Sequence, residues 1–556
     1  MIRQILLASL LVTVLPTMAQ KDNVWSTHAT PSVHVSEVHE KMQTGKFAPN
    51  YESLSQYQVP EWFRDVKFGI WAHWGPQCVE GSGDWMARNM YIEGSPAYNH
   101  HVKKFGHPSE FGFKDILPLF KAERWSPDSL VAYYKSLGAE YFFAMGNHHD
   151  NFDLWDSKYQ EWNSMRIGAH RDILGEWAKA ARKNGLRFGV SIHADRAWRF
   201  YETAQRYDRQ HGKYMGVPYD GNMTKADGKG KWWEGMDPQN LYAQNHPLSE
   251  GSWADKMISR QWNWDKGCNL PSEKYCTNFY DRTLDVINRY SPDLLYFDTT
   301  VLPLYPFSDA GLKIAAHYYN HSAAQHKGKT DCVMFGKILN EQWKKALVWD
   351  VEKGSPNQIQ TQPWQSCSCI GGWHYSTDIY ENNKYKSAAT VVRLLVDIVS
   401  KNGNLLLSVP LRADGTFDEK EKAVLDEFGA WMRVNKESII GTRPWQVFGE
   451  GPIANSVVKM NDQGFNEGSY TKATASEIRF TQTAKYIYAT ALGWPEERKV
   501  IIHSLASGNP YHKKKISQAT LLGYGKVKAQ QTADGLVISL PKTNVNTIAP
   551  VFKIKK

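Results

Sequence analysis

The sequence predicts an α/β protein: a TIM-like (β/α)-barrel with an undetermined number of strands, followed by a C-terminal β-sandwich. From Trp62 to about Asn435, short apolar runs alternate with amphipathic helical stretches, which is the pattern of repeated βα units. After GTRPW at 441–445, the pattern changes to short strands separated by turn residues, as in a small sandwich. The length of 556 residues agrees with two domains of this kind.

Six apolar runs in the first part lack the alternation of a half-exposed strand, so they indicate parallel strands buried on both faces. They are KFGIWA (67–72), YFFAM (141–145), RFGVSI (187–192), DLLYF (293–297), ALVWDV (346–351) and NLLLSVP (404–410). In the C-terminal part, the predicted strands lie in SEIRFTQT, KYIYATALG, KVIIHSL, GLVISL and APVFKIKK.

The helices between these strands have recognisable ends. In SPDSLVAYYKSLG, Ser126 is the expected N-cap, Pro127 the first helical residue and Gly138 the stop. HRDILGEWAKAARKNG should end at Gly185 and SAATVVRLLVDIVSKNG at Gly403, because glycine adopts the left-handed conformation that follows many helices. Strands and helices in rotation over this length favour a barrel.

The N-terminus has the pattern of a secretory signal. Arg3 gives a positive start, an apolar stretch runs to Leu15, and Thr17-Met18-Ala19 forms a small-residue cleavage site. We therefore expect a signal peptide at 1–19 and a mature chain that starts at Gln20, is secreted across the inner membrane and is water-soluble in the periplasm. The apolar stretch is too short to span a membrane.

The remaining organisation follows from the change of pattern along the chain. Residues 20–59 are predicted to form an N-terminal extension, 60–440 the catalytic barrel and 446–556 the sandwich. Between 201 and 275 the βα rhythm gives way to a polar stretch rich in Gly and Trp. We interpret 201–275 as a long loop insertion over one end of the barrel.

Composition excludes several classes of protein. A mean hydropathy of -0.53 excludes a polytopic membrane protein. The net charge of +9 is spread along the chain, and its one dense basic run, KKK at 513–515, does not make a nucleic-acid-binding stripe. The 22 Trp and 28 Tyr exceed what packing usually requires, and exposed aromatic faces suit sugar rings.

The six cysteines leave two questions open. Cys268 and Cys276 could close a disulfide loop in an oxidising compartment, although the pairing cannot be deduced from the sequence. Cys367 and Cys369 form a C-S-C pair without a second pair elsewhere. Buried thiols or a disulfide are therefore favoured over a zinc site.

Polar side chains follow the apolar runs, at the C-terminal strand ends where catalytic residues of such barrels gather. These positions hold His73, Asn147 to Asp150, His193, Asp298 and Glu352. Any one of them is consistent with an ordinary loop residue. Five strand ends that carry a histidine or a carboxylate together indicate a functional site.

Asp298 and Glu352 are the candidate catalytic pair, since each closes an apolar run. Two carboxylates are what glycoside hydrolysis needs: one attacks the anomeric carbon, and the other protonates the departing oxygen and then activates water. Retaining enzymes hold them about 5–5.5 Å apart and inverting enzymes further apart. The sequence does not reveal this distance.

Three segments, WFRDVKFGIWAHWGP, YFFAMGNHHDNFDLWDS and KNGNLLLSVPLRADGTFDEKE, resemble the α-L-fucosidases of glycoside hydrolase family 29. GTRPW and SEIRFTQTAKYIYATALGWP are similar to that family's domain junction and C-terminal domain. The resemblance implies an exo-acting retaining enzyme that removes terminal α-L-fucosyl residues from a glycan. It implies neither a cofactor nor a metal, and no nucleic-acid or membrane partner.

The resemblance also implies roles for individual residues. Asp298, in SPDLLYFD, matches the family's nucleophile, while Glu352, in VWDVEKG, is the acid/base by position, with Glu341 as the fallback. The histidines would bind sugar hydroxyls, the tryptophans would wall the sugar ring and its methyl group, and Asp150 would brace the loop. The implied substrate-binding residues are His73, Asp84, Trp85, His148, His149, His193 and Trp373.

This chain departs from the family's patterns around the predicted sugar pocket. Asn147 and Asn151 replace the lysine and glycine of a KHHDGF-type block, and Asp84 precedes Trp85 in place of a glutamate. The segment SIH, which ends in His193, stands where the family has YYS. The family's WE-x-C element has Gln365 in place of its glutamate. α-L-Galactose, which adds a hydroxyl at C6, is therefore an alternative sugar.

Other classes of function fit less well. A serine hydrolase would need a G-x-S-x-G turn after a strand, which is absent. A metal hydrolase is disfavoured because the adjacent His148 and His149 should diverge and H-E-x-x-H is absent. A non-catalytic carbohydrate-binding protein is the alternative from another class, but it would not need both carboxylates. The oligomeric state is not predicted.

Overall fold

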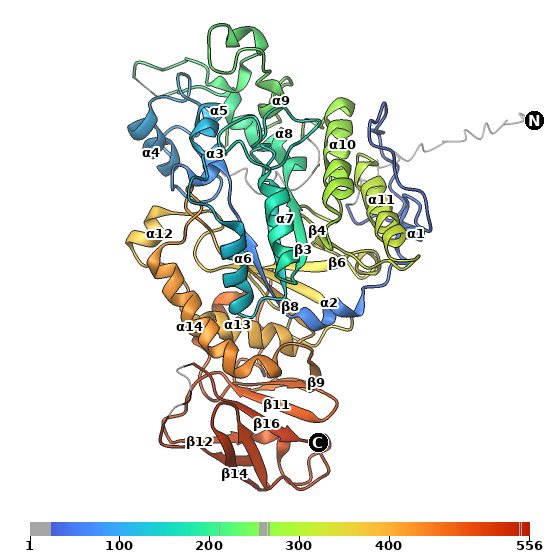
Figure 1. The fold of residues 1–556 in the computed structure, drawn as a ribbon, viewed down its shortest axis with the longest axis vertical. Helices are drawn as coiled ribbons and strands as arrows, with labels where there is room; N and C mark the ends of the chain where they lie inside the picture. The colour runs from blue at the N-terminus through green and yellow to red at the C-terminus, as the bar shows by residue number, and fades with distance from the viewer. Residues whose placement is uncertain (1–23, 211, 255–263, 265–266, 544, 546–547) are drawn as a thin grey trace, which may run out of the picture.

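The computed structural model describes residues 24–556 except 211, 255–263, 265–266, 544 and 546–547 (Figure 1). The predicted signal peptide at 1–19 lies outside the described residues. Among the helices that are described, none is both long and apolar enough to cross a membrane.

Eight parallel strands close into a barrel in chain order, which confirms the predicted (β/α)-barrel. The strands are β1 (Phe68–Ala72), β2 (Tyr141–Asn147), β3 (Arg187–Ile192), β4 (Leu294–Phe297), β5 (Val333–Lys337), β6 (Val348–Glu352), β7 (Trp364–Cys369) and β8 (Gly403–Ser408). The barrel closes where β8 pairs with β1, with Leu405 opposite Phe68. All eight C-terminal strand ends therefore meet at one mouth.

Two strands, β5 and β7, escaped the sequence prediction because β5 contains only a short apolar run and β7 contains none. β5 (VMFGK) ends in a lysine, and β7 (WQSCSC) is largely polar although every residue of it is buried. The polar side chains of β7 are satisfied inside the protein: Gln365 donates to Asp350 at 2.9 Å and Ser366 to the Gly354 carbonyl at 2.7 Å. Hydrogen bonding between strands thus replaces the apolar pattern that the prediction required.

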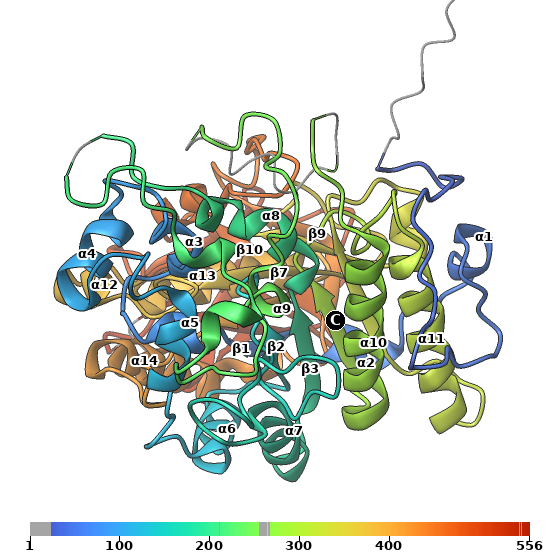
Figure 2. The ribbon, with the colours of Figure 1, turned by 90° about the horizontal axis from the view of Figure 1, so that it is seen from above.

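Helices surround the barrel, as seen from its mouth in Figure 2. The longer ones are α6 (Pro127–Ser136), α7 (Ile173–Lys183), α10 (Glu273–Tyr290), α11 (Ala310–Gln325), α13 (Ala388–Ser400) and α14 (Glu419–Asn435). Ser126 and Pro127 begin α6 as predicted. The predicted stop at Gly403 is wrong: α13 ends at Ser400, Asn402 takes the left-handed conformation (φ 73°), and Gly403 already starts β8.

Short helices and loops cover the mouth of the barrel, at the end away from the C-terminal domain (Figures 1 and 2). They are α3 (Met86–Asn89), α4 (Pro96–Phe105), α5 (Phe113–Ile116), α8 (Ala197–Phe200) and α9 (Gln239–Tyr242). The remaining short helices are α1 (Tyr51–Leu54), α2 (Glu61–Val66) and α12 (Thr377–Glu381). Apart from the first residues of α10, the described part of 201–275 contains only 3-10 turns and α9, in keeping with a loop-rich segment.

The C-terminal domain is an antiparallel sheet with its own core. Its strands are β9 (Arg443–Glu450), β10 (Ile478–Gln482), β11 (Tyr486–Ala491), β12 (Lys499–Ile502), β13 (Gln518–Leu521), β14 (Gly525–Gln531), β15 (Leu536–Ser539) and β16 (Val551–Lys555). Hydrogen bonds run continuously through the order β12-β15-β14-β13-β16-β11-β10-β9. Trp445 of β9 and Val500 of β12, from opposite edges, share one core, so the sheet folds over on itself as a sandwich does.

No disulfide joins any two of the six cysteines. The bridge considered between Cys268 and Cys276 is therefore not formed. The C-S-C pair holds no zinc set either: Cys367 Sγ lies 3.1 Å from Asp350 Oδ2, and Cys369 Sγ lies 2.9 Å from the Gly371 carbonyl. Both thiols belong to the buried interior of the barrel, as the sequence favoured.

A buried cluster of charges joins the barrel to the C-terminal domain. Asp397 of α13 accepts hydrogen bonds from Arg479 Nε of β10 at 2.7 Å, Lys401 Nζ at 2.7 Å and Ser355 Oγ at 2.8 Å. Burial by itself would raise the pKa of Asp397, but the two cations outweigh it and lower that pKa. The carboxylate thus neutralises two cations at the domain interface.

Replacement of Asp397 by alanine should strongly destabilise the protein. It would leave the buried Lys401 without its carboxylate and remove one of the two carboxylates that Arg479 contacts, at a cost of roughly 3–5 kcal/mol in the free energy of unfolding. Urea denaturation followed by tryptophan fluorescence measures the change. Asp378→Ala is the matched control: its pair with Lys384 is more than half exposed, so the expected cost is much smaller. Equal effects of the two changes would contradict a stabilising role for the buried cluster.

Candidate active site

A pocket that opens to solvent lies at the mouth of the barrel. It is lined by Trp71, His73, Asp84, Trp85, His148, His193, Tyr296, Asp298, Lys337, Glu352 and Trp373. We call it the active-site pocket. Every residue predicted for the site lines this pocket except His149, which lies behind the lining residues, and the fallback Glu341. The strand ends converge at this mouth of the barrel.

The two predicted carboxylates lie on either side of a lysine. Asp298 directly follows β4 and Glu352 ends β6. Lys337 Nζ lies 2.6 Å from Asp298 Oδ1 and 2.6 Å from Glu352 Oε2. The two contacting oxygens can therefore be at most about 5 Å apart, which agrees with the separation of about 5–5.5 Å in retaining glycosidases.

Lys337 is a site residue that sequence reasoning missed. It is the last residue of β5, so it holds the same kind of position as Asp298 and Glu352. The rule that found those carboxylates would have found Lys337 if VMFG had been taken as a strand. His374, next to Trp373, was missed for the same reason, since it follows the polar strand β7.

A loop from beyond the barrel holds the backbone of Glu352. The Glu352 amide donates to the Gln463 carbonyl at 2.8 Å, and the Phe465 amide donates to the Glu352 carbonyl at 2.8 Å. Gly464 between them has φ 134°, and a Cβ there would lie 2.1 Å from the Glu352 carbonyl oxygen. Only glycine fits this close approach. The fallback Glu341 instead has an 88% exposed side chain that pairs with Lys344 outside the pocket.

Imidazoles form one wall of the pocket, and neighbouring side chains orient them. His73, after β1, lies with Nδ1 2.9 Å from Ser408 Oγ at the end of β8. Gln77 Nε2 donates to His148 Nδ1 at 2.8 Å, which leaves the proton of a neutral His148 on Nε2. His374 Nδ1 lies 2.8 Å from Asp84 Oδ1. The predicted site residue Asp84 thus orients the imidazole of His374.

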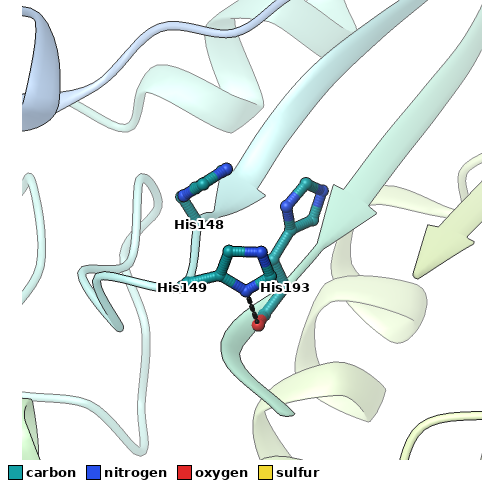
Figure 3. Close-up of side chains that lie close together, drawn as sticks. All are labelled: His148, His149 and His193. Atoms are coloured by element: carbon teal, nitrogen blue, oxygen red, sulfur yellow. Dashed lines mark hydrogen bonds between the residues drawn. The ribbon is translucent and has the colours of Figure 1, made fainter. Parts of the chain in front are cut away.

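His148, His149 and His193 come from the adjoining ends of β2 and β3 (Figure 3). His149 Nδ1 donates to the His193 carbonyl at 3.0 Å, and its Nε2 lies 3.3 Å from Asp298 Oδ2. His149 thus supports the candidate nucleophile. Neither ring nitrogen of His193 has a hydrogen-bond partner among the described residues, although the side chain is buried. Such a ring needs a polar partner, which a sugar hydroxyl would supply.

The three histidines come closer together than the sequence suggested. One ligand atom from each of His148, His149 and His193 lies within 4.8 Å of the others, and Asp84, His148 and His374 form a second such group. The expectation that adjacent histidines diverge is therefore wrong. Either group has the spacing to hold a metal ion, but both ring nitrogens of His149 and Nδ1 of His374 already have protein partners. We interpret both groups as hydroxyl-binding walls.

Burial and charge set the protonation states in the pocket. Burial by itself would raise the pKa of Asp298, but the Lys337 ammonium and the contact with His149 outweigh it and hold that pKa well below its usual range. Burial lowers the pKa values of His73, His148 and His193 well below the ordinary histidine range. Asp298 is therefore ionised at neutral pH, whereas these imidazoles are neutral and each offers one donor and one acceptor.

Aromatic rings form the rest of the lining. Trp71 and Tyr296 rise from the barrel interior, while Trp85 and Trp373 come from loops. The backbone of Trp85 is left-handed, with φ 62°. A bulky residue rarely adopts this conformation, and such strain gathers at binding sites. The pocket thus combines polar imidazoles with apolar rings.

Asn147 and Asn151, two positions at which this chain departs from the family's pattern, have side chains that do not face the pocket. Asn147 Oδ1 accepts from the His193 and Ala194 amides at 3.0 and 3.1 Å, so it ties the end of β2 to the chain after β3. Asn151 has φ 63°, a left-handed conformation that asparagine tolerates better than most residues in place of glycine. Its Nδ2 donates to the Leu241 carbonyl at 2.9 Å. Both asparagines are structural, so neither determines which sugar binds.

Two further carboxylates support the site from behind. Asp150 Oδ1 accepts from the Phe152 amide at 3.2 Å, and burial raises the pKa of Asp150 to about 6. Asp350, two residues before Glu352, accepts from Gln365 Nε2. Gln365 thus stands within the barrel and not in the pocket.

Comparison with known proteins agrees with this geometry. The α-L-fucosidase family profile matches residues 34–437, and the α-L-fucosidase C-terminal domain profile matches residues 471–555. Mouse tissue α-L-fucosidase is 25% identical over 531 residues, which cover 91% of this chain and 93% of the relative. Human tissue α-L-fucosidase is 24% identical over 532 residues, or 91% and 90% of the two chains.

A solved structure shares the fold. Thermotoga maritima α-fucosidase in complex with fucose aligns with a TM-score of 0.63 at 24% identity, over 91% of this chain and 100% of that one. The family profile covers most of the chain and contains every residue that lines the active-site pocket. The chain therefore belongs to the α-L-fucosidase family of glycoside hydrolases.

Proposed function

We propose that the chain is an exo-acting, retaining α-L-fucosidase that removes terminal α-L-fucosyl residues from glycans. One observation carries the proposal: Asp298 and Glu352 each lie 2.6 Å from the same Lys337 nitrogen. Their contacting oxygens are therefore at most about 5 Å apart, which supports the short carboxylate separation of about 5–5.5 Å used in double displacement. A carbohydrate-binding protein without activity would have no need of this arrangement.

In the first step, an oxygen of Asp298 bonds to the anomeric carbon while the bond to the leaving oxygen breaks and Glu352 gives that oxygen its proton. In the second step, Glu352 takes a proton from water, whose oxygen bonds to the anomeric carbon as the ester to Asp298 breaks. Each step inverts the anomeric centre, so the product keeps the α-configuration. His149 and Lys337 hold Asp298 ionised for the attack.

The lining of the pocket supports a single deoxy sugar as the bound group. Neutral His193 can donate one hydrogen bond to a hydroxyl and accept another, while His73 and His148 each keep Nε2 for a hydroxyl because Nδ1 already has a protein partner. The rings of Trp71, Trp85, Tyr296 and Trp373 offer apolar contact, which suits the methyl group and the ring face of fucose.

α-L-Galactosidase activity is the second candidate function, and His193 is the observation that favours it. This residue ends SIH where the family's pattern has YYS, and both of its ring nitrogens are buried without a partner among the described residues. A hydroxyl at C6 would give it one. Whether His193 meets C6 or another position decides between the two sugars.

The test is hydrolysis of 4-nitrophenyl α-L-fucoside in parallel with the α-L-galactoside. We expect faster release of nitrophenol from the fucoside, and proton NMR should show the α-anomer of fucose as the first product. Addition of EDTA should leave the rate unchanged. Turnover of neither glycoside would overturn the proposal, a β-anomer would exclude retention, and a preference for the galactoside would establish the second candidate.

A further inference from the structure

Lys337 occupies an unusual position for a cation in a site that uses two carboxylates. Its Nζ lies 2.6 Å from Asp298 Oδ1 and 2.6 Å from Glu352 Oε2, and its side chain is only 6% exposed. It therefore contacts the candidate nucleophile and the candidate acid/base equally. Any part that this lysine plays in catalysis rests on the proposed double-displacement function.

Other titratable groups also face the Lys337 ammonium, from every strand around it. They are Tyr296 from β4, Asp350 from β6, Cys367 from β7, and His73 and His193 after β1 and β3. Burial raises the pKa values of the Tyr296 phenol and the Cys367 thiol well above their ordinary ranges and lowers those of the two histidines. These four groups are therefore neutral near pH 7.

Asp350 is the remaining carboxyl group near Lys337. Burial raises the pKa of Asp350 to about 6, and its oxygens accept from Gln365 Nε2 at 2.9 Å and lie 3.1 Å from Cys367 Sγ. Asp350 faces Lys337 across the β5–β6 pairing, but among the described residues the ion pairs of the ammonium are with Asp298 and Glu352. The two catalytic carboxylates are therefore the principal charge partners of Lys337.

The reaction moves one negative charge between these two partners. Before the first step, Asp298 is a carboxylate and Glu352 carries the proton that the leaving oxygen will take. After it, Asp298 is a neutral ester and Glu352 is a carboxylate. The second step reverses the transfer: Glu352 takes a proton from water, and the breaking ester bond returns the electron pair to Asp298.

We propose that Lys337 is a charge-balancing and positioning residue that pairs with Asp298 before the first step and with Glu352 in the covalent intermediate. An ammonium that contacts both carboxylates neutralises the charge in each state without moving. Such preorganised charge is worth more in a buried site than in water, because no solvent has to reorient as the charge moves. The same two contacts hold the carboxylates at the separation that retention requires.

The test compares Lys337→Met, which removes the charge at similar length, with Lys337→Arg, which keeps it. Activity on an aryl α-L-fucoside falls at low pH as the nucleophile becomes protonated. Without the ammonium, less positive charge counteracts the effect of burial, so the pKa of Asp298 rises. The acidic limb of kcat/KM in Lys337→Met should therefore move to higher pH by about one unit or more. In Lys337→Arg the limb should stay at the wild-type pH, whatever the change in kcat.

The rates provide a second readout. We expect kcat of Lys337→Met to fall roughly 10²- to 10³-fold, as for loss of one preorganised charge partner in a buried site. Lys158→Met, which removes a half-exposed lysine that pairs with Glu40 and does not line the pocket, is the control for a general loss of charge. If Lys337→Met does not fold, as judged by thermal unfolding, Lys337→Gln provides the neutral variant with a polar side chain.

The outcomes separate the two proposals. A wild-type protein that turns over no glycoside overturns the proposed function, and the role of Lys337 with it. If the wild type is active but the folded neutral variant has its acidic limb of kcat/KM at the same pH, only the role of Lys337 is overturned. A purely structural role would lower the rate in both Lys337 variants but leave the limb at the same pH.

Discussion

Replacement of Asp298 by glycine is expected to lower kcat for an aryl α-L-fucoside by roughly 10⁴- to 10⁶-fold, as expected for removal of a covalent nucleophile. The variant lacks the oxygen that attacks the anomeric carbon, while the imidazole wall and aromatic lining that bind the sugar stay in place. We therefore expect a much smaller change in the affinity for fucose. Steady-state kinetics and calorimetric titration with fucose measure the two effects.

Sodium azide sharpens this prediction, because it can enter the space that Asp298 leaves. Attack from that face should give β-L-fucosyl azide, with the opposite configuration to the substrate, which proton NMR identifies. Asp156→Gly, which changes an exposed aspartate paired with Arg289, is the control and should keep wild-type activity. Full activity of Asp298→Gly would show that another group is the nucleophile.

Replacement of Glu352 by alanine should produce a loss that depends on the leaving group. A methyl or sugar leaving group needs a proton as it departs, so kcat/KM for such substrates should fall roughly 10²- to 10⁴-fold. 2,4-Dinitrophenolate departs without one, so the first step should be nearly as fast as in the wild type. Breakdown of the intermediate then lacks its base, and stopped-flow measurements should show a burst of dinitrophenol.

Azide distinguishes the role of Glu352 from that of Asp298. In Glu352→Ala it should attack the covalent intermediate from the opposite face and give α-L-fucosyl azide, so the two variants yield products of opposite configuration. Glu341→Ala is the control, since that side chain is exposed outside the pocket, and it should behave as the wild type. Azide rescue of Glu341→Ala in place of Glu352→Ala would move the acid/base to position 341.

Much of the site could be predicted from strand ends alone. His73, His193, Asp298 and Glu352 each follow or end a short apolar run, and the C-terminal ends of parallel barrel strands necessarily meet at one mouth. The rule failed where the apolar run of a strand is short or absent. Lys337 was not predicted because only four residues of β5 precede it.

The hydrogen-bond partners of these residues could not be predicted in the same way. Asn147 and Asn151 stand beside the histidines in the sequence, and both were taken to flank the sugar. In the structure each turns toward backbone groups of other segments, at 193–194 and 240–241. Periodicity shows which residues end a strand, but the partner across the barrel comes from a segment that can be a hundred residues away.

The amino-acid sequence is sufficient for the barrel, for the second domain and for the kinds of side chain that gather at the mouth, because these depend on local periodicity and on chain order. The equal contact of Lys337 with Asp298 and Glu352, and the unpartnered ring of His193, appear only once the barrel closes. Closure places strands β3 to β6 side by side, and the distances between their ends are set by that packing. The chemistry of the reaction could therefore be inferred from the sequence, whereas the balance of charge that supports it is a property of the folded chain.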